Sequence, residues 1–187
     1  MHGWHPRKVG HDELNLIKTL QRGRMYIASH PDFASPILLK LAFDDDDKPD
    51  MDHEVAVYQA VDGQGIAPAF YGHVLGNRGN SVGFITEYVS PTASATQRDY
   101  HGCLQALRSL HLYGISHGDA HIGNCLPRPG GTAVLVDFEL AEFLSEDAPD
   151  APAEYRRDLD IMQRFGVRYI LKGETVIDRQ IRGTNGP

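Results

Sequence analysis

The first half of the chain alternates hydrophobic and polar positions over short runs, a pattern typical of β-strands. Turn-forming residues such as glycine, asparagine and proline separate the runs. The predicted strands occupy residues 14–28, where two strands flank a turn at 21–24, and residues 37–43, 69–75 and 82–89. The strand at 37–43 is strongly apolar, yet it contains one charged residue, Lys40.

Helical periodicity indicates three helices. Val55, Tyr58 and Val61 share one face of a helix predicted at residues 52–61, which Asp52 could cap. A longer helix is expected from about residue 92 to 113, and a last one from 153 to about 171. A small hairpin lies between the last two, with strands at 125–126 and 133–137 around a Pro-Gly-Gly turn. The order predicts an α+β chain with a β-rich first lobe and a mostly helical second lobe.

Composition and charge narrow the class of protein. The content of 41% hydrophobic and 23% charged residues is that of a globular domain. No apolar run approaches the roughly 20 residues that cross a bilayer, and the N-terminus lacks the apolar segment of a secretory signal. We therefore expect no membrane association and a cytoplasmic or nuclear location. The net charge of -7 argues against a general nucleic-acid-binding protein, which needs a dominant basic surface.

The two cysteines, Cys103 and Cys125, are too few for a disulfide framework and fit a reducing compartment. Cys125 is expected to pack in the hairpin as a small apolar residue.

The stretch HGDAHIGN, residues 117–124, concentrates the candidate chemistry. His117 and His121 are four residues apart, as in some helical zinc sites, but Gly118 and Gly123 disfavour a helix and no glutamate lies between the histidines in the HExxH pattern. A polar turn, in which these groups only hydrogen-bond the local backbone, is a second interpretation.

Phosphoryl transfer is the third interpretation. It needs an aspartate to orient the attacking hydroxyl, together with an asparagine and a further aspartate that hold Mg²⁺ on ATP. Asp119 and Asn124 are five residues apart, and Asp137 follows at the end of an apolar strand. All three residue types therefore occur in the required order.

HGDAHIGN resembles the catalytic loop of the protein-kinase-like superfamily, and Asp137-Phe138-Glu139 resembles its DFG motif. Gly118 and His121 are more similar to aminoglycoside and choline phosphotransferases and their fungal kinase-like relatives than to conventional protein kinases. The segment at residues 158–165 also resembles small atypical kinases such as that of the KEOPS complex. The resemblance extends from about residue 14 to 171. It implies one kinase-like domain over residues 1–187, with an N-lobe at about 12–88, a hinge at about 87–91 and a C-lobe at about 92–187.

The resemblance also implies the roles of individual residues in binding ATP and Mg²⁺. Asp119 would be the catalytic base, His121 would face the transferred phosphate, and Asn124 and Asp137 would be the metal ligands. His117 would be a structural histidine that supports the loop. The resemblance implies further nucleotide-binding positions. Lys40 would bind the α and β phosphates, and Glu54 would pair with Lys40. Gly23 would belong to the phosphate loop, and Glu87 to Val89 to the hinge.

Some of these residues also have structural interpretations. Lys40 could be a charge at a strand edge, and Glu54 an exposed helix residue. Asp158 either resembles the helix aspartate that hydrogen-bonds the catalytic loop, or it is a helix N-terminal charge favoured by the dipole.

The chain departs from the kinase pattern in its phosphate loop and in its C-lobe. Gly23 is the single glycine where several are usual, no Ala-Pro-Glu anchor follows Phe138, and only a short polar tail follows Leu171. We therefore expect the phosphate acceptor to be a small hydroxylated molecule or one specific protein partner. The alternative is a pseudokinase-like module that binds nucleotide, or serves as a scaffold, without turnover.

Overall fold

The computed structural model describes residues 3–42, 44, 46–90, 97–145 and 149–172. The chain divides into two compact units. The first comprises Met1–Gln59 and Pro68–Tyr88, and the second comprises Ala60–Ala67 and Val89–Pro187. The prediction of an α+β chain is confirmed, because a mixed sheet and three α-helices are present among the described residues.

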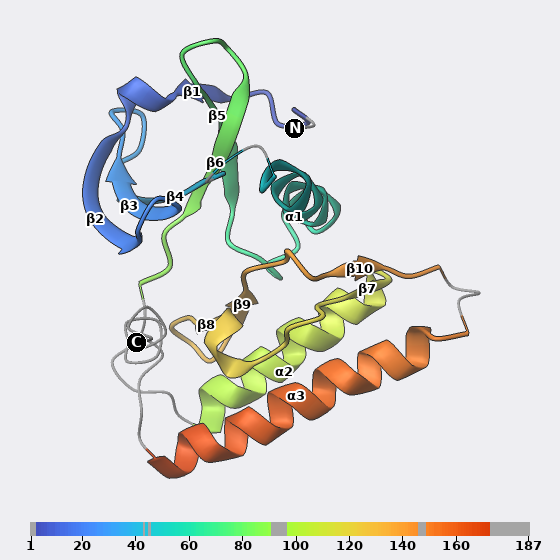
Figure 1. Ribbon diagram of the computed structural model, residues 1–187. Coiled ribbons are helices and arrows are strands. Elements are labelled where there is room, and N and C mark those ends of the chain that lie inside the picture. Colours follow the sequence, from blue (N-terminus) through green and yellow to red (C-terminus); the bar gives the residue numbers. More distant parts are fainter. Residues whose placement is uncertain (1–2, 43, 45, 91–96, 146–148, 173–187) are drawn as a thin grey trace, which may run out of the picture. The chain divides into compact units, whose positions relative to one another are not determined.

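The first unit is built on a six-stranded sheet with the order β1-β5-β6-β4-β3-β2 (Figure 1). Its strands are β1 (Lys8–Gly10), β2 (Asn15–Gln21), β3 (Met25–Ser29), β4 (Ile37–Leu41), β5 (Phe70–Leu75) and β6 (Ser81–Glu87). Neighbouring strands are antiparallel, except that β1 lies parallel to β5. The strands predicted from alternation are all present. β1 was not predicted, because its three residues are too few to show a period.

Helix α1 (Lys48–Ala60) belongs to the first unit and begins four residues earlier than predicted. The expectation that Asp52 caps it is wrong, since Asp52 is the fifth helical residue. The Met51 N–H already donates to the Asp47 carbonyl at 3.1 Å, and Pro49 lies in the first turn, where its missing N–H costs nothing. The helix therefore starts with Lys48-Pro49.

The second unit contains α2 (Gln97–Leu112), α3 (Ala151–Lys172) and two small antiparallel ladders. α2 and α3 lie side by side (Figure 1). One ladder pairs β7 (Ile115–Ser116) with β10 (Glu142–Phe143), and the other pairs β8 (Cys125–Pro127) with β9 (Ala133–Leu135). Short 3₁₀ turns occur at His11–Glu13 in the first unit and at Ile122–Asn124 in the second. Among the described residues, no helix is both long and apolar enough to cross a membrane.

Strand β9 is shorter than the predicted strand at 133–137. It ends at Leu135, and two residues later Asp137 adopts a left-handed backbone with a φ of 66°. Such a conformation cannot continue a pleated strand. Alternation alone could not reveal this ending.

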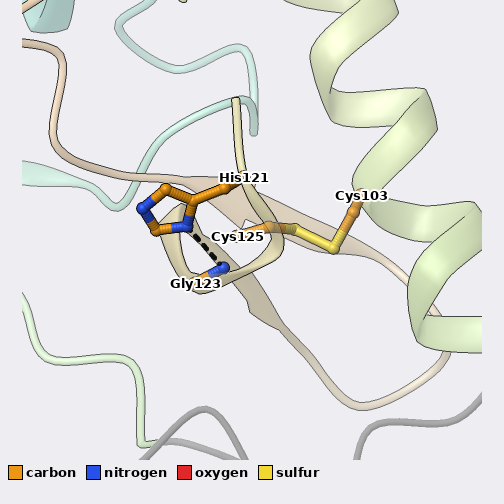
Figure 2. Close-up of a disulfide and its surroundings, with 4 residues drawn as sticks. All are labelled: Cys103, His121, Gly123 and Cys125. Atoms are coloured by element: carbon orange, nitrogen blue, oxygen red, sulfur yellow. Dashed lines mark hydrogen bonds between the residues drawn. A yellow bond between two sulfur atoms is a disulfide. The ribbon is translucent and has the colours of Figure 1, made fainter. Parts of the chain in front are cut away.

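Cys103 on α2 and Cys125 on β8 form a disulfide (Figure 2). Their Cα atoms are 5.8 Å apart although 22 positions separate them in the sequence. Cys125 is fully buried in the hairpin as expected, but it is half of a disulfide and not a free thiol, so the argument for a reducing compartment loses its basis. Counting cysteines failed here because only the packing of a helix against a strand brings this pair together.

Candidate active site

The segment that joins β7 to β8 contains HGDAHIGN, and a carboxylate from α3 holds its beginning. The backbone N–H groups of His117 and Gly118 donate to Asp158 Oδ2 and Oδ1, at 2.6 and 3.0 Å. His111 Nε2, at the end of α2, lies 2.9 Å from the same Oδ2, and the His111 ring stacks on Tyr155. Asp158 is only 1% exposed and is the eighth residue of its helix, beyond the first turn where the dipole acts. Of its two interpretations, the contact with the loop is therefore the correct one.

Gly118 is required by the local geometry. Its φ of 75° lies in the left-handed region, and a Cβ at this position would collide with the Leu140 carbonyl oxygen. Gly118 thus has no room for a side chain, because the segment that follows Asp137-Phe138-Glu139 lies directly against it.

Asp119 and Asn124 are connected by hydrogen bonds. Asn124 Nδ2 donates to the Asp119 carbonyl oxygen at 3.0 Å and to Asp119 Oδ2 at 3.2 Å. The Asp119 side chain is 44% exposed, whereas Asn124 is buried. The contacts to the Asp119 carboxylate from the described residues therefore use Oδ2, and Oδ1 remains available to a hydroxyl group.

His121 also faces Asp119. Its Nδ1 accepts a hydrogen bond from the Gly123 N–H at 3.0 Å (Figure 2). In a neutral ring the proton then sits on Nε2, which lies 3.4 Å from Asp119 Oδ2. The ring thus directs an N–H at the same carboxylate oxygen that Asn124 contacts.

The β8–β9 hairpin brings Asp137 to the same part of the second unit. Asn124 immediately precedes β8, and the Val136 N–H, just after β9, donates to the Asn124 carbonyl at 3.0 Å. Asp137 follows with an exposed side chain and is the one non-glycine residue of the described chain with a positive φ. Strained backbone of this kind gathers at functional sites, and here it turns the chain out of the strand.

The donor set of Asn124 and Asp137 fits Mg²⁺. The side-chain hydrogen bonds of Asn124 use its Nδ2 group, which leaves the amide oxygen for a ligand. Asp137 adds an exposed carboxylate. Carboxylate and amide oxygens are the ligands that hard divalent cations take.

His117 does not support the zinc interpretation. Its ring is fully buried 5.3 Å from the Phe138 ring, and neither ring nitrogen has a hydrogen-bond partner. Burial lowers the pKa of His117, although the nearby Asp158 carboxylate acts in the opposite direction. No group of three or more ligand side chains among the described residues includes His117 or His121. His117 is therefore a neutral histidine that packs behind the loop.

In the first unit, Lys40 and Glu54 form a buried ion pair. Lys40 Nζ lies 2.7 Å from Glu54 Oε2, and the side chains are 5% and 2% exposed. The interpretations as a strand-edge charge and an exposed helix residue are both wrong. Gly83 on the neighbouring strand β6 lets the β4 backbone approach closely, since a Cβ on it would collide with the Lys40 carbonyl oxygen.

The three other predicted nucleotide-binding residues have less distinctive settings. Gly23 lies in the tight turn between β2 and β3, with a φ of 78° and an Arg24 N–H to Gln21 O bond of 3.1 Å, so the turn alone accounts for the glycine. Glu87 ends β6, and its side chain accepts from the Ala69 N–H at 3.2 Å. Val89 follows as the first residue of the longer segment of the second unit and is half-buried.

The role of His111 beside the loop was not predicted from the sequence. The signal that could have indicated it is a histidine on the apolar face of a helix, next to Leu107 and Leu110. A polar group at such a position needs a partner, and Asp158 is that partner.

A comparison of the chain with protein-family models and with curated proteins finds no match. Its function must therefore be inferred from the motifs and from the geometry described above.

Proposed function

We propose that this chain is an ATP- and Mg²⁺-dependent phosphotransferase with a two-lobe protein-kinase-like fold. The first unit would be the β-rich lobe and the second a shortened helical lobe. The observation that carries the proposal is the arrangement of Asp119, Asn124 and Asp137. Asn124 bonds to Asp119 through Nδ2, and the hairpin joins Asn124 to the strained Asp137.

Asp119 would act on the acceptor hydroxyl. With Oδ2 engaged by Asn124 Nδ2 and facing His121 Nε2, its Oδ1 is the atom that would receive the hydroxyl proton. Asn124 and His121 would thereby fix which carboxylate oxygen faces the acceptor. When bound, Mg²⁺ would neutralise phosphate charge, and the Asn124 amide oxygen and the Asp137 carboxylate are the groups that would hold it.

Lys40 would supply the positive charge for the α and β phosphates. The contact with Glu54 fixes the ammonium group in the interior of the first unit. A lysine held this way by a helix glutamate matches the strand-lysine and helix-glutamate pair of the kinase-like family.

The acceptor would be a small hydroxylated molecule or one specific protein. A competing function is a pseudokinase-like module that binds nucleotide without turnover. Gly23 favours this alternative, since it is explained by a β-turn and no further glycines follow to bring backbone amides to the phosphates.

The test is a thermal-shift titration of the full chain with ATP and ADP, with and without Mg²⁺, followed by a transfer assay. γ-Labelled ATP would be offered with alcohols, amino sugars and candidate proteins. We expect Mg²⁺-dependent stabilisation and label transfer to at least one acceptor class. No Mg²⁺-dependent stabilisation would overturn the proposal, and binding without hydrolysis or transfer would select the pseudokinase alternative.

A further inference from the structure

The Cys103–Cys125 disulfide lies one residue away from a proposed metal ligand. Cys125 directly follows Asn124 and ends the 3₁₀ turn at Ile122–Asn124, where its N–H donates to the Ile122 carbonyl. Its side chain is bonded to Cys103 on α2, and both residues are fully buried. The backbone of Asn124 is therefore anchored to a long helix through the next residue.

The same disulfide lies at the end of the hairpin from which Asp137 emerges. Cys125, the first residue of β8, pairs with Leu135, the last residue of β9. Asn124 precedes the one strand and Asp137 follows the other, so both proposed metal ligands extend from the cross-linked end. A single covalent bond thus restrains both of them.

The opposite end of the hairpin rests on α2 without a covalent bond. A Cβ on Gly102, next to Cys103, would lie 2.6 Å from the Gly131 carbonyl oxygen and 3.1 Å from the Thr132 carbonyl carbon. Helix and turn are therefore in backbone contact there. At the ligand end, the hydrogen bonds of Asn124 stay within the loop and the hairpin, to Asp119, His121 and Val136. The disulfide adds a covalent bond between that end and α2.

We propose that the Cys103–Cys125 disulfide is a positioning element for Asn124 and Asp137. The oxidised chain therefore binds Mg²⁺-nucleotide, and the reduced chain loses the contribution of the metal to nucleotide affinity. The proposal rests on the function proposed above. A dithiol reductant would break the S–S bond with two electrons and two protons, which leaves two thiols on the chain and a disulfide on the reductant. Because both sulfurs are buried, reduction requires local opening of the second unit.

The test compares three forms of the full chain: oxidised, reduced with a dithiol and verified by thiol counting, and the double variant Cys103→Ala/Cys125→Ala. ATP affinity would be measured by calorimetry with and without Mg²⁺. We expect the gain in ATP affinity that Mg²⁺ provides to fall by about tenfold or more in the reduced and double-alanine forms. A loss of this size is typical when groups that orient metal ligands are removed. Metal-free ATP affinity should be unchanged, and reoxidation should restore the gain.

Met162→Ala is the matched control, because it removes a fully buried side chain from α3 without touching the disulfide. It should lower the stability of the second unit and keep the Mg²⁺ gain. If the reduced and double-alanine forms keep the gain as well, the disulfide is a structural cross-link only and the proposal is overturned.

Hydrogen exchange separates this inference from the proposed function. The amides of Asn124 and Val136, which bond to His121 and Asn124, should exchange faster in the reduced chain, while those of β4 and β6 should not change. If the oxidised chain binds no nucleotide, the proposed function fails, but this exchange difference still tests the positioning. Equal exchange in the oxidised and reduced chains would overturn it.

Discussion

Lys40 Nζ and Glu54 Oε2 lie 2.7 Å apart in the interior of the first unit, joining strand β4 to helix α1. Removal of one partner deprives a buried charge of its counter-ion at 2.7 Å. We therefore expect Lys40→Met or Glu54→Leu to lower the free energy of unfolding by about 3–5 kcal/mol. The double variant should recover most of this loss, because two apolar groups replace the pair. Urea unfolding of all four chains measures this directly.

The same variants separate a structural from a functional Lys40. If Lys40 binds phosphate, the double variant should fold normally and bind ATP roughly 10- to 100-fold more weakly, the value of a charge-assisted hydrogen bond. If the double variant folds stably and binds ATP with unchanged affinity, the Lys40–Glu54 pair contributes to stability but not to ATP binding.

Asp158 should be difficult to replace even by asparagine. Its two oxygens accept from the backbone N–H groups of His117 and Gly118, and His111 lies against one of them. An amide has one acceptor oxygen, so Asp158→Asn leaves a buried N–H group facing another donor, at a cost of about 1–3 kcal/mol. Asp160→Asn, on an exposed position of the same helix, is the control and should unfold like the wild type. Equal denaturation midpoints for the two variants would contradict the role assigned to Asp158.

Gly118→Ala should be more damaging than its small size suggests. It combines a left-handed backbone, which costs a residue with a Cβ about 1–2 kcal/mol, with a collision against the Leu140 carbonyl oxygen. Gly130→Ala is the matched control, since Gly130 has a φ of 91° and no heavy atom within 4 Å of the added Cβ. The difference in unfolding free energy between the two variants isolates the cost of the collision. If they unfold alike, Leu140 does not constrain the loop.

Much of the first unit could be predicted from the sequence, because alternation and turn residues specify strands locally. The pairing of Lys40 with Glu54 was implied by the resemblance to the kinase-like superfamily. The residues alone also allowed a strand-edge lysine and an exposed helix glutamate, because nothing near either residue in the sequence shows that the two side chains meet in the interior.

The second unit was less predictable because its contacts are remote in sequence. Asp158 meets the loop about 40 positions away, and nothing near Asp158 indicates whether it faces solvent or the loop. The disulfide depends on the packing of α2 against β8, and β7 and β10 have two residues each, too few for any period. The left-handed backbone of Asp137 could not be predicted either, because an aspartate at the end of a strand is compatible with several backbone conformations.

His117 gives the second unit a defined pH dependence. Burial lowers its pKa in the folded chain below the ordinary value of 6.5, so the unfolded chain binds the proton more readily. The contribution to stability is therefore complete above pH 6.5 and declines as the pH falls below it toward the folded pKa. His117→Leu should flatten this decline and cost little at neutral pH, because neither ring nitrogen has a partner to lose. Urea midpoints of both chains on either side of pH 6.5 test this, and parallel pH profiles would contradict it.

Asp119 and Asp137 should differ in what their amide variants lose. A general base contributes roughly 10²- to 10⁴-fold to rate, and Asp119→Asn keeps an oxygen that can accept from Asn124 Nδ2. This variant should therefore lose most phosphate transfer and retain nearly all Mg²⁺-ATP affinity. Asp137→Asn should lose the Mg²⁺-dependent part of ATP binding as well, because a neutral amide is a poorer ligand for a hard cation than a carboxylate. Calorimetry with and without Mg²⁺, combined with single-turnover transfer, separates the two effects, and Asp160→Asn controls for the loss of one negative charge. If Asp119→Asn transfers phosphate at the wild-type rate to the true acceptor, HGDAHIGN is a polar turn held by Asp158 and not a catalytic loop.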